Sequence, residues 1–501
     1  MTTEGSGAQT PGQEIPLAYR TVRGGLWVAL SSYWTIGFGF VANIILTRLL
    51  SPEAFGTFGL ATFFAQLLRL EPKLGIGQAF GQYRETSGEA VGTYLGLNGP
   101  IILAGLLLTA LAAPVLLKLG YDSLVVQVTL VLALAAALES AGGLAGVMLD
   151  KEMRFGPTSR WQMVVFPLSY APAFWLATHG GGAWSLASQT LTYSALLWVG
   201  AWWIVYRRLP HLRAMRWRFS RSLAGRFLRF GITLGAVMLA AMLLTQLDNF
   251  LIGTLVGVTV LGFYDRAYRT AQWPGTLLTN MVSRTAFYTY ARLQDDLPRL
   301  RKTVTMLLWM IVLLAWPIAL VIFVTAPDLI RLLYGERWLP SVVYLRLLVL
   351  IATARPVWDN ATTLFAAIGK PTWGLAFMAV QIGVLVAFGL PMTWRWGAVG
   401  TCGAVGLAFA VGLVGAYGYL KREIDFRPDA GIIIPVLVSA LTVAGYMLLN
   451  RVADINALSV PVRVGVKSLW VLVAYFGLNF LLQPRQMRER LGYVWRLGKG
   501  K

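Results

Sequence analysis

Charge is what this chain has least of. Only 13% of its 501 residues are Asp, Glu, Lys or Arg, whereas soluble domains carry about 25%. Hydrophobic residues make up 57% of the chain, and the mean hydropathy is +0.63. So few charges cannot supply the polar surface of a soluble domain. The composition therefore indicates a protein that is embedded in a membrane.

Cysteine and histidine are almost absent as well. The single cysteine, Cys402, excludes a disulfide within the chain and any site built from several cysteines. The two histidines, His179 and His211, lie far apart in polar connections. We therefore predict no metal site, no cofactor and no catalytic residue. The sequence also has no connection long enough to fold as a soluble catalytic domain, so we do not expect an enzyme.

Long apolar segments recur from residue 24 to residue 482. Each is close to the roughly 20 residues that a helix needs to cross a hydrocarbon core. We predict an all-α polytopic membrane protein with about fourteen transmembrane helices. The predicted spans are 24–47, 55–76, 93–116, 124–147, 161–179, 183–206, 230–254, 262–284, 303–325, 341–368, 373–392, 396–419, 432–449 and 463–482.

Basic residues fix the predicted orientation. If the N-terminus is cytoplasmic, Lys and Arg concentrate in the cytoplasmic connections, and residues 207–229 alone carry eight arginines. By the positive-inside rule both termini are then cytoplasmic. The net charge of +21 accordingly indicates anionic membrane lipids as partners, not nucleic acid. Residues 207–231 mix arginine with aromatic residues, which favours an interfacial amphipathic helix over a cytosolic docking site.

The chain contains a weak internal repeat. At an offset of 206 residues, LLSPEAFGTFGLATFFAQ (49–66) aligns with LVGVTVLGFYDRAYRTAQ (255–272), and Gly56 meets Gly262. Six predicted spans separate the copies, so both halves enter the membrane in the same direction and a central cavity is expected between them. The predicted parts are a cytoplasmic tail (1–23), a six-helix lobe (24–206), a basic amphipathic linker (207–229), a second, parallel six-helix lobe (230–419), two appended C-terminal helices (420–482) and a basic cytoplasmic tail (483–501).

Polar side chains form stripes on the two repeated helices. On residues 262–284 the stripe runs from Asp265 through Arg269 at helical spacing, and on residues 55–76 it runs from Thr62 through Arg69. Lipid cannot satisfy such stripes, so they must face protein or water. The predicted substrate-binding residues of a cationic cavity are Gln66, Arg69, Lys73, Arg266, Arg269, Gln272, Thr276 and Asn280.

A structural explanation of these charges stays open. Asp265 and Arg269 are four residues apart and could simply pair, and Arg266 could be an anchor at the membrane interface. Other intramembrane polar residues have the same ambiguity, because each is either an ion-coupling site or a hydrogen bond between helices. These residues are Asp248, Asn249, Asp265, Arg355 and Asp359.

Four blocks of the sequence together resemble a known family. They are LTRLLSPEAFGTFGLA, LDNFLIGTLVGVTVLGFYDRAYR, LIRLLYGERWLPS and AAIGKPTW. In order and spacing they are similar to the polysaccharide transporter family, the Wzx-type flippases of lipid-linked oligosaccharides. That family lies in the superfamily that also holds multidrug extruders and lipid II flippases. The resemblance covers roughly residues 20–480.

The resemblance implies two six-helix lobes around a cavity and transport by alternating access. The implied substrate is an undecaprenyl-pyrophosphate-linked oligosaccharide, and a polysaccharide polymerase and export machinery are implied partners. Arginine suits the pyrophosphate because its planar fork forms paired, charge-assisted hydrogen bonds. Three alternatives remain: a multidrug or organic-cation extruder on the same fold, a membrane enzyme of polysaccharide assembly, and a scaffold without transport activity.

Overall fold

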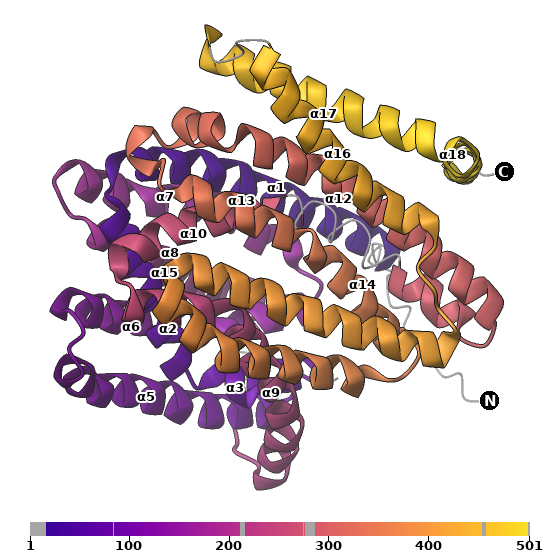
Figure 1. Ribbon diagram of the computed structural model, residues 1–501. Helices are drawn as coiled ribbons and strands as arrows, with labels where there is room; N and C mark the ends of the chain where they lie inside the picture. The colour runs from indigo at the N-terminus through magenta and orange to yellow at the C-terminus, as the bar shows by residue number, and fades with distance from the viewer. Residues whose placement is uncertain are drawn as a thin grey trace, which may run out of the picture. The chain divides into compact units, whose positions relative to one another are not determined.

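The computed structural model describes residues 17–83, 85–210, 216–273, 275, 286–452 and 457–498, and throughout these ranges the regular elements are helices (Figure 1). The chain forms two compact units. The first comprises Met1–Asn43, Leu68–Val115 and Leu130–Gly235, and the second comprises Ile44–Leu67, Leu116–Thr129 and Ala236–Lys501. The α-helical, polytopic character predicted from composition is confirmed.

The helices follow one another closely along the chain. They are α1 (Leu17–Leu49), α2 (Pro52–Leu68), α3 (Glu71–Leu74), α4 (Ile76–Gln82), α5 (Gly88–Lys118), α6 (Ser123–Lys151), α7 (Phe155–Thr178), α8 (Ala183–Arg208), α9 (Arg221–Leu255), α10 (Val258–Ala271), α12 (Leu297–Leu333), the 3-10 helix η2 (Glu336–Trp338), α13 (Ser341–Ala352), α14 (Ala354–Ala367), α15 (Pro371–Ile424), α16 (Ala430–Val452), α17 (Val460–Leu482) and α18 (Pro484–Gly498).

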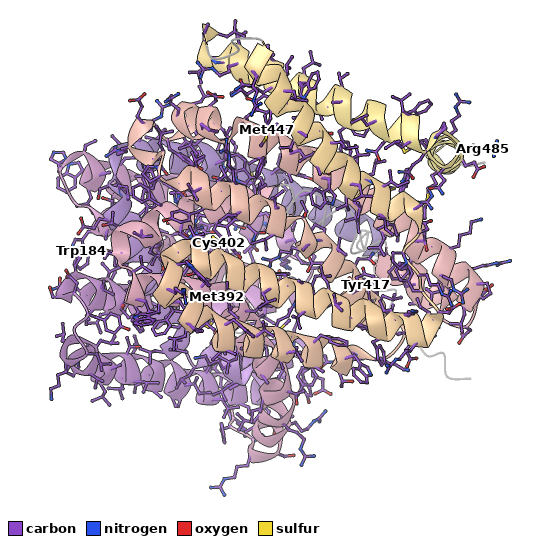
Figure 2. All side chains as sticks on the ribbon, in the orientation of Figure 1. Trp184, Met392, Cys402, Tyr417, Met447 and Arg485 are labelled. Atoms are coloured by element: carbon purple, nitrogen blue, oxygen red, sulfur yellow. The ribbon has the colours of Figure 1, made fainter. Side chains whose placement is uncertain are left out.

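Within the described residues, nine helices are long and apolar enough to cross a membrane. One of them, α15, contains a break at Gly397, whose φ of 59° and ψ of −147° suit glycine and interrupt the helix. The two arms run back along each other, since Thr393 and Thr401 share a hydrogen bond of 2.7 Å. Figure 2 labels Met392 and Cys402 on either side of the break. The arms correspond to two predicted spans, while the total of fourteen stays a prediction.

The two repeat copies, α2 and α10, pack directly against each other through glycine. A Cβ on Gly56 would lie 1.6 Å from the carbonyl oxygen of Val258, and a Cβ on Gly262 would lie 1.8 Å from that of Pro52. The offset of 206 residues relates Gly56 to Gly262 and Pro52 to Val258, so each contact is the repeat equivalent of the other. The repeated glycines thus let two backbones touch about a local pseudo-two-fold axis.

Trp338 fills the space next to this contact. Its indole N–H donates to the carbonyl of Thr47 at 2.9 Å, and its ring meets Phe55 and Phe263 edge-on at 5.5 and 5.9 Å. Gly335, with φ of 96°, provides the turn that brings the tryptophan inward. Three of the four sequence blocks therefore meet at one buried cluster of the second unit.

The other cores are local to each unit. In the first unit, α4, α5, α6 and α8 enclose Phe80, Tyr94 and Met148. In the second unit, α16 and α17 pack along α12 (Figure 1), with Trp309 and Tyr475 in the cluster.

Candidate functional site

The predicted site residues fall on several helices. In the second unit, α9 carries Asp248 and Asn249, α10 and its C-cap carry Asp265, Arg266, Arg269 and Gln272, α14 carries Arg355 and Asp359, and α2 carries Gln66. In the first unit, Arg69 follows α2 and Lys73 lies on α3. Thr276 and Asn280 lie outside the described residues.

Asp265 is the centre of the charged group on α10. Its Oδ2 lies 2.6 Å from Nη2 of Arg266 and 3.0 Å from Nε of Arg269. One carboxylate therefore neutralises only one of two arginines, and the group keeps one positive charge. The pairing of residues 265 and 269, four apart on one helix, is the arrangement that their spacing predicts.

The two arginines differ in burial. The Arg266 side chain is only 6% exposed, and its guanidinium lies 4.2 Å from the centre of the Phe55 ring on α2. Arg266 is therefore packed inside the unit, which fits neither the alternative of an anchor at the membrane interface nor a direct contact with substrate. Arg269, by contrast, is 57% exposed and contacts Asp265 through Nε. Of the two arginines, Arg269 is therefore the one with an accessible side chain.

A second polar group surrounds Asp248. The Tyr264 hydroxyl donates to Oδ2 of this buried carboxylate at 2.6 Å, and the backbone N–H of Asn249 donates to Oδ1 at 2.9 Å. Tyr264 stacks on Tyr268, with ring centres 6.1 Å apart. The Tyr268 hydroxyl in turn interacts with the side chains of Gln272 and Arg355.

Tyr264 is not among the site residues predicted from the sequence, so its bond to Asp248 was not anticipated. The structure shows it fully buried. The sequence did contain a signal. Helices α9 and α10 form a hairpin around Val256 and Gly257, and Asp248 and Tyr264 lie at similar distances from this turn. Residues placed in this way on antiparallel helices lie at the same level, where their side chains can meet.

In the first unit, Arg69 belongs to a different kind of group. It lies 3.2 Å from Glu71 and 3.3 Å from Glu139 of α6, and it donates to the Ser140 hydroxyl at 2.9 Å. Neither glutamate was predicted as part of the site. Glu139 could have been found, because it stands inside the apolar segment 124–147.

The continuous polar stripe predicted on residues 55–76 is wrong. Helix α2 ends at Leu68, and α3 begins at Glu71. Pro72 explains the interruption, because it has no N–H to donate to Leu68 and its ring would clash with that carbonyl. Arg69 therefore lies between helices, and it does not share one helical face with Gln66.

Residues 45–343 match the sequence model of a protein family that is described as polysaccharide biosynthesis protein. The succinoglycan biosynthesis transport protein ExoT of Rhizobium meliloti is 27% identical over 313 residues, which are 62% of this chain and 62% of ExoT. The lipopolysaccharide biosynthesis protein WzxC of Escherichia coli is 25% identical over 364 residues, which are 70% of this chain and 71% of WzxC. The alignment thus spans less than two thirds of ExoT.

Solved structures share the fold. The lipid II flippase MurJ, in an inward closed conformation, superposes with a TM-score of 0.75 at 13% identity, covering 92% of this chain and all of MurJ. An inward-facing multidrug resistance transporter of the MATE family gives a TM-score of 0.59 at 15% identity, covering 77% of this chain and 94% of the transporter. The predicted fold class, that of flippases and extruders, is confirmed.

Proposed function

The chain belongs to the polysaccharide biosynthesis protein family, and from this premise we propose that it is a flippase of lipid-linked oligosaccharides. It would move a polyprenyl-pyrophosphate-linked oligosaccharide from the cytoplasmic to the outer leaflet by alternating access. The observation that carries the proposal is the family match over residues 45–343, because that range contains all the charged groups described on α9 and α10 and around Arg69. The names of ExoT and WzxC, which concern glycan transport and synthesis, support it.

Arg269 is the group that we assign to the pyrophosphate. A buried carboxylate holds its Nε, while its exposed side chain can form paired hydrogen bonds with phosphate oxygens. In the first unit the two glutamates beside Arg69, Glu71 and Glu139, already balance its charge, so Lys73 would be the added positive charge there. Arg266 would contribute mainly by keeping Asp265 ionised and in place, because it is itself buried. Gln66 and Gln272, with Thr276 and Asn280, suit sugar hydroxyls.

Asp248 is the group that we assign to coupling with a driving ion. A buried carboxylate in a membrane transporter is a natural proton or cation site. The hydroxyl of Tyr264 holds it at 2.6 Å, and the contacts of Tyr268 extend from there toward Arg355. Asn249 lies on α9 with Asp248, and Asp359 lies on α14 with Arg355. Both would complete the polar surroundings of the carboxylate.

We further propose the inner membrane as the location, with both termini cytoplasmic and with the two lobes 24–206 and 230–419 as the moving parts. A polysaccharide polymerase and its export machinery would take the product in the outer leaflet. Anionic lipids would hold the basic linker 207–229 at the cytoplasmic surface.

Reconstituted vesicles test the function. Purified protein is inserted into liposomes that contain a fluorescent polyprenyl-pyrophosphate oligosaccharide, and a membrane-impermeant quencher reports which leaflet holds the label. We expect the protected fraction to become accessible only with the protein present. An organic cation offered in the same vesicles separates the proposal from an extruder. Transport of the cation without movement of the lipid-linked glycan would contradict the flippase.

A further inference from the structure

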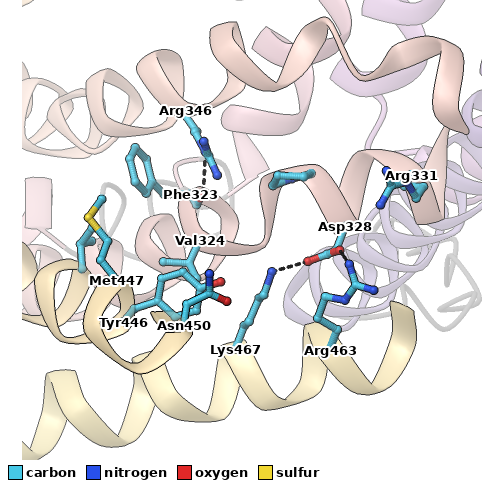
Figure 3. A pocket seen from close by; sticks show the side chains of 12 residues that line it. Phe323, Val324, Asp328, Arg331, Arg346, Tyr446, Met447, Asn450, Arg463 and Lys467 are labelled. Carbon is cyan, nitrogen blue, oxygen red and sulfur yellow. Dashed lines mark hydrogen bonds and ion pairs between the residues drawn. The ribbon is translucent and has the colours of Figure 1, made fainter. Parts of the chain in front are cut away.

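A second charged cavity lies in the second unit, away from the groups on α9 and α10. It has a volume of about 420 Å³ and is lined by the C-terminal parts of α12 and α16, the N-terminal part of α17 and the middle of α13 (Figure 3). The residues that matter most for its chemistry are Asp328, Arg331, Arg346, Arg463 and Lys467. The predicted topology places these helix ends on the outer side of the membrane.

The side chains that line the cavity carry more positive charge than the nearby carboxylates neutralise. Asp328, only 1% exposed, accepts from Lys467 at 2.6 Å and from Arg463 at 3.0 Å, so two cations of α17 share one carboxylate. Figure 3 shows both side chains directed at Asp328. This part has a structural role, because it ties α17 to α12.

Two further arginines contribute to the excess. Arg346 donates through Nε to the backbone carbonyl of Phe323 at 3.3 Å, which does not neutralise its charge. Arg331 pairs at 3.4 Å with Glu336, a highly exposed residue outside the cavity wall. Even with Glu336 counted, four cations face two carboxylates. An ion pair that only fastened helices would not need Arg331 and Arg346.

Part of the cavity lining is apolar. Met447 and Tyr446 of α16 line it together with Val443, and Met447 is 58% exposed. Two turns before Val443, on the same face of α16, Val436 is another exposed apolar side chain. A ligand in this place meets cations in the cavity and an apolar surface beside it, which is the chemistry of a lipid with an anionic headgroup.

We propose that this cavity binds the phosphate headgroup of an anionic phospholipid from the surrounding bilayer. Arg346 and Arg331 would donate to the phosphate oxygens, and the acyl chains would lie along α16 beside Met447. The lipid would thereby bridge α13 and the appended helices α16 and α17. The proposal is independent of the cargo and the direction of transport.

The experiment measures thermal unfolding of the full-length protein in a non-ionic detergent, with and without added phosphatidylglycerol. Phosphatidylcholine, which has no net charge, is the lipid control. The test variant is the double substitution Arg331→Gln and Arg346→Gln, which leaves the Asp328 ion pairs in place. The matched control is Arg299→Gln, which removes one charge from the other end of α12.

We expect phosphatidylglycerol to raise the Tm of the wild-type protein and of the control more than phosphatidylcholine does. Loss of two charge-assisted contacts should weaken the double variant's apparent affinity for the lipid roughly tenfold or more. An equal rise in the double variant would overturn the proposal. Inorganic phosphate that produced the same rise would show a free-anion site and overturn the assignment to a lipid. If the double variant does not purify as a single species, the Arg346→Gln variant alone is compared in the same way.

Discussion

Helices α2 and α10 are two copies of one element, yet they differ in chemistry. Both use a glycine at the same repeat position to bring their backbones into contact. In α2 the residues equivalent to Asp265 and Arg266 are Gly59 and Leu60, which are both buried and apolar. The backbone contact therefore needs the glycines but not the charges. We therefore expect the charges of α10 to serve something other than this backbone contact.

The largest effect should come from breaking the shared contact itself. Gly262→Ala places a methyl group 1.8 Å from the Pro52 carbonyl oxygen, so the two helices must separate. We expect a loss of about 3 kcal/mol of stability or more, at the upper end for overpacking. The yield of monodisperse protein and its Tm in detergent measure the effect.

Gly59→Ala is the matched control for this substitution. It lies on α2, where the nearest atom to its new Cβ would be 3.6 Å away. Its Tm should stay near that of the wild-type protein. If both alanines were equally tolerated, the close packing of the two copies would be refuted.

The next effect should come from removing the carboxylate that distinguishes α10. Asp265→Ala leaves the buried Arg266 without its ion-pair partner, which should cost about 3–5 kcal/mol. Adding Arg266→Leu makes this position resemble Leu60 of α2 and should recover most of the stability, because replacing a buried pair by apolar residues is often neutral. Thermal unfolding of the two variants decides this. A double variant as unstable as the single one would show that the fold itself uses the pair.

A third variant tests the role assigned to the exposed arginine. Arg269→Ala keeps the pair of Asp265 and Arg266, so the protein should fold, but glycan flipping should fall roughly tenfold to a hundredfold with the loss of charge-assisted bonds. Arg299→Ala, which removes an exposed arginine of α12, should keep full activity. The vesicle assay measures both. Full flipping by the Arg269→Ala protein would remove Arg269 from the site.

The smallest effect on stability should come from Asp248→Asn. The amide oxygen can accept from the backbone N–H of Asn249 while the amide nitrogen donates to the Tyr264 hydroxyl oxygen, so the Tm should change little. Removing the ionisable group should instead make flipping insensitive to an applied ion gradient. The control is Asp295→Asn, an exposed position ahead of α12. Unchanged ion dependence of the Asp248→Asn protein would indicate a structural hydrogen bond.

The sequence alone determined the membrane class and the helical content, because a bilayer requires apolar segments of about 20 residues and few charges. The repeat was visible as a fixed offset between similar segments. The pairing of Asp265 with Arg269 also followed from spacing on one helix. The continuity of the stripe on residues 55–76 did not hold, although Pro72 was visible in the sequence.

Only the tertiary structure decided which charges are buried and which are accessible. Arg266 and Arg269 are three residues apart on one helix, yet Phe55 of another helix covers the first and leaves the second open. Likewise, Glu139 reaches Arg69 across 70 residues of sequence, and Lys467 reaches Asp328 across 139. Spacing along a helix fixes the neighbours on that helix. Burial depends on the side chains that other helices bring, and no local pattern encodes them.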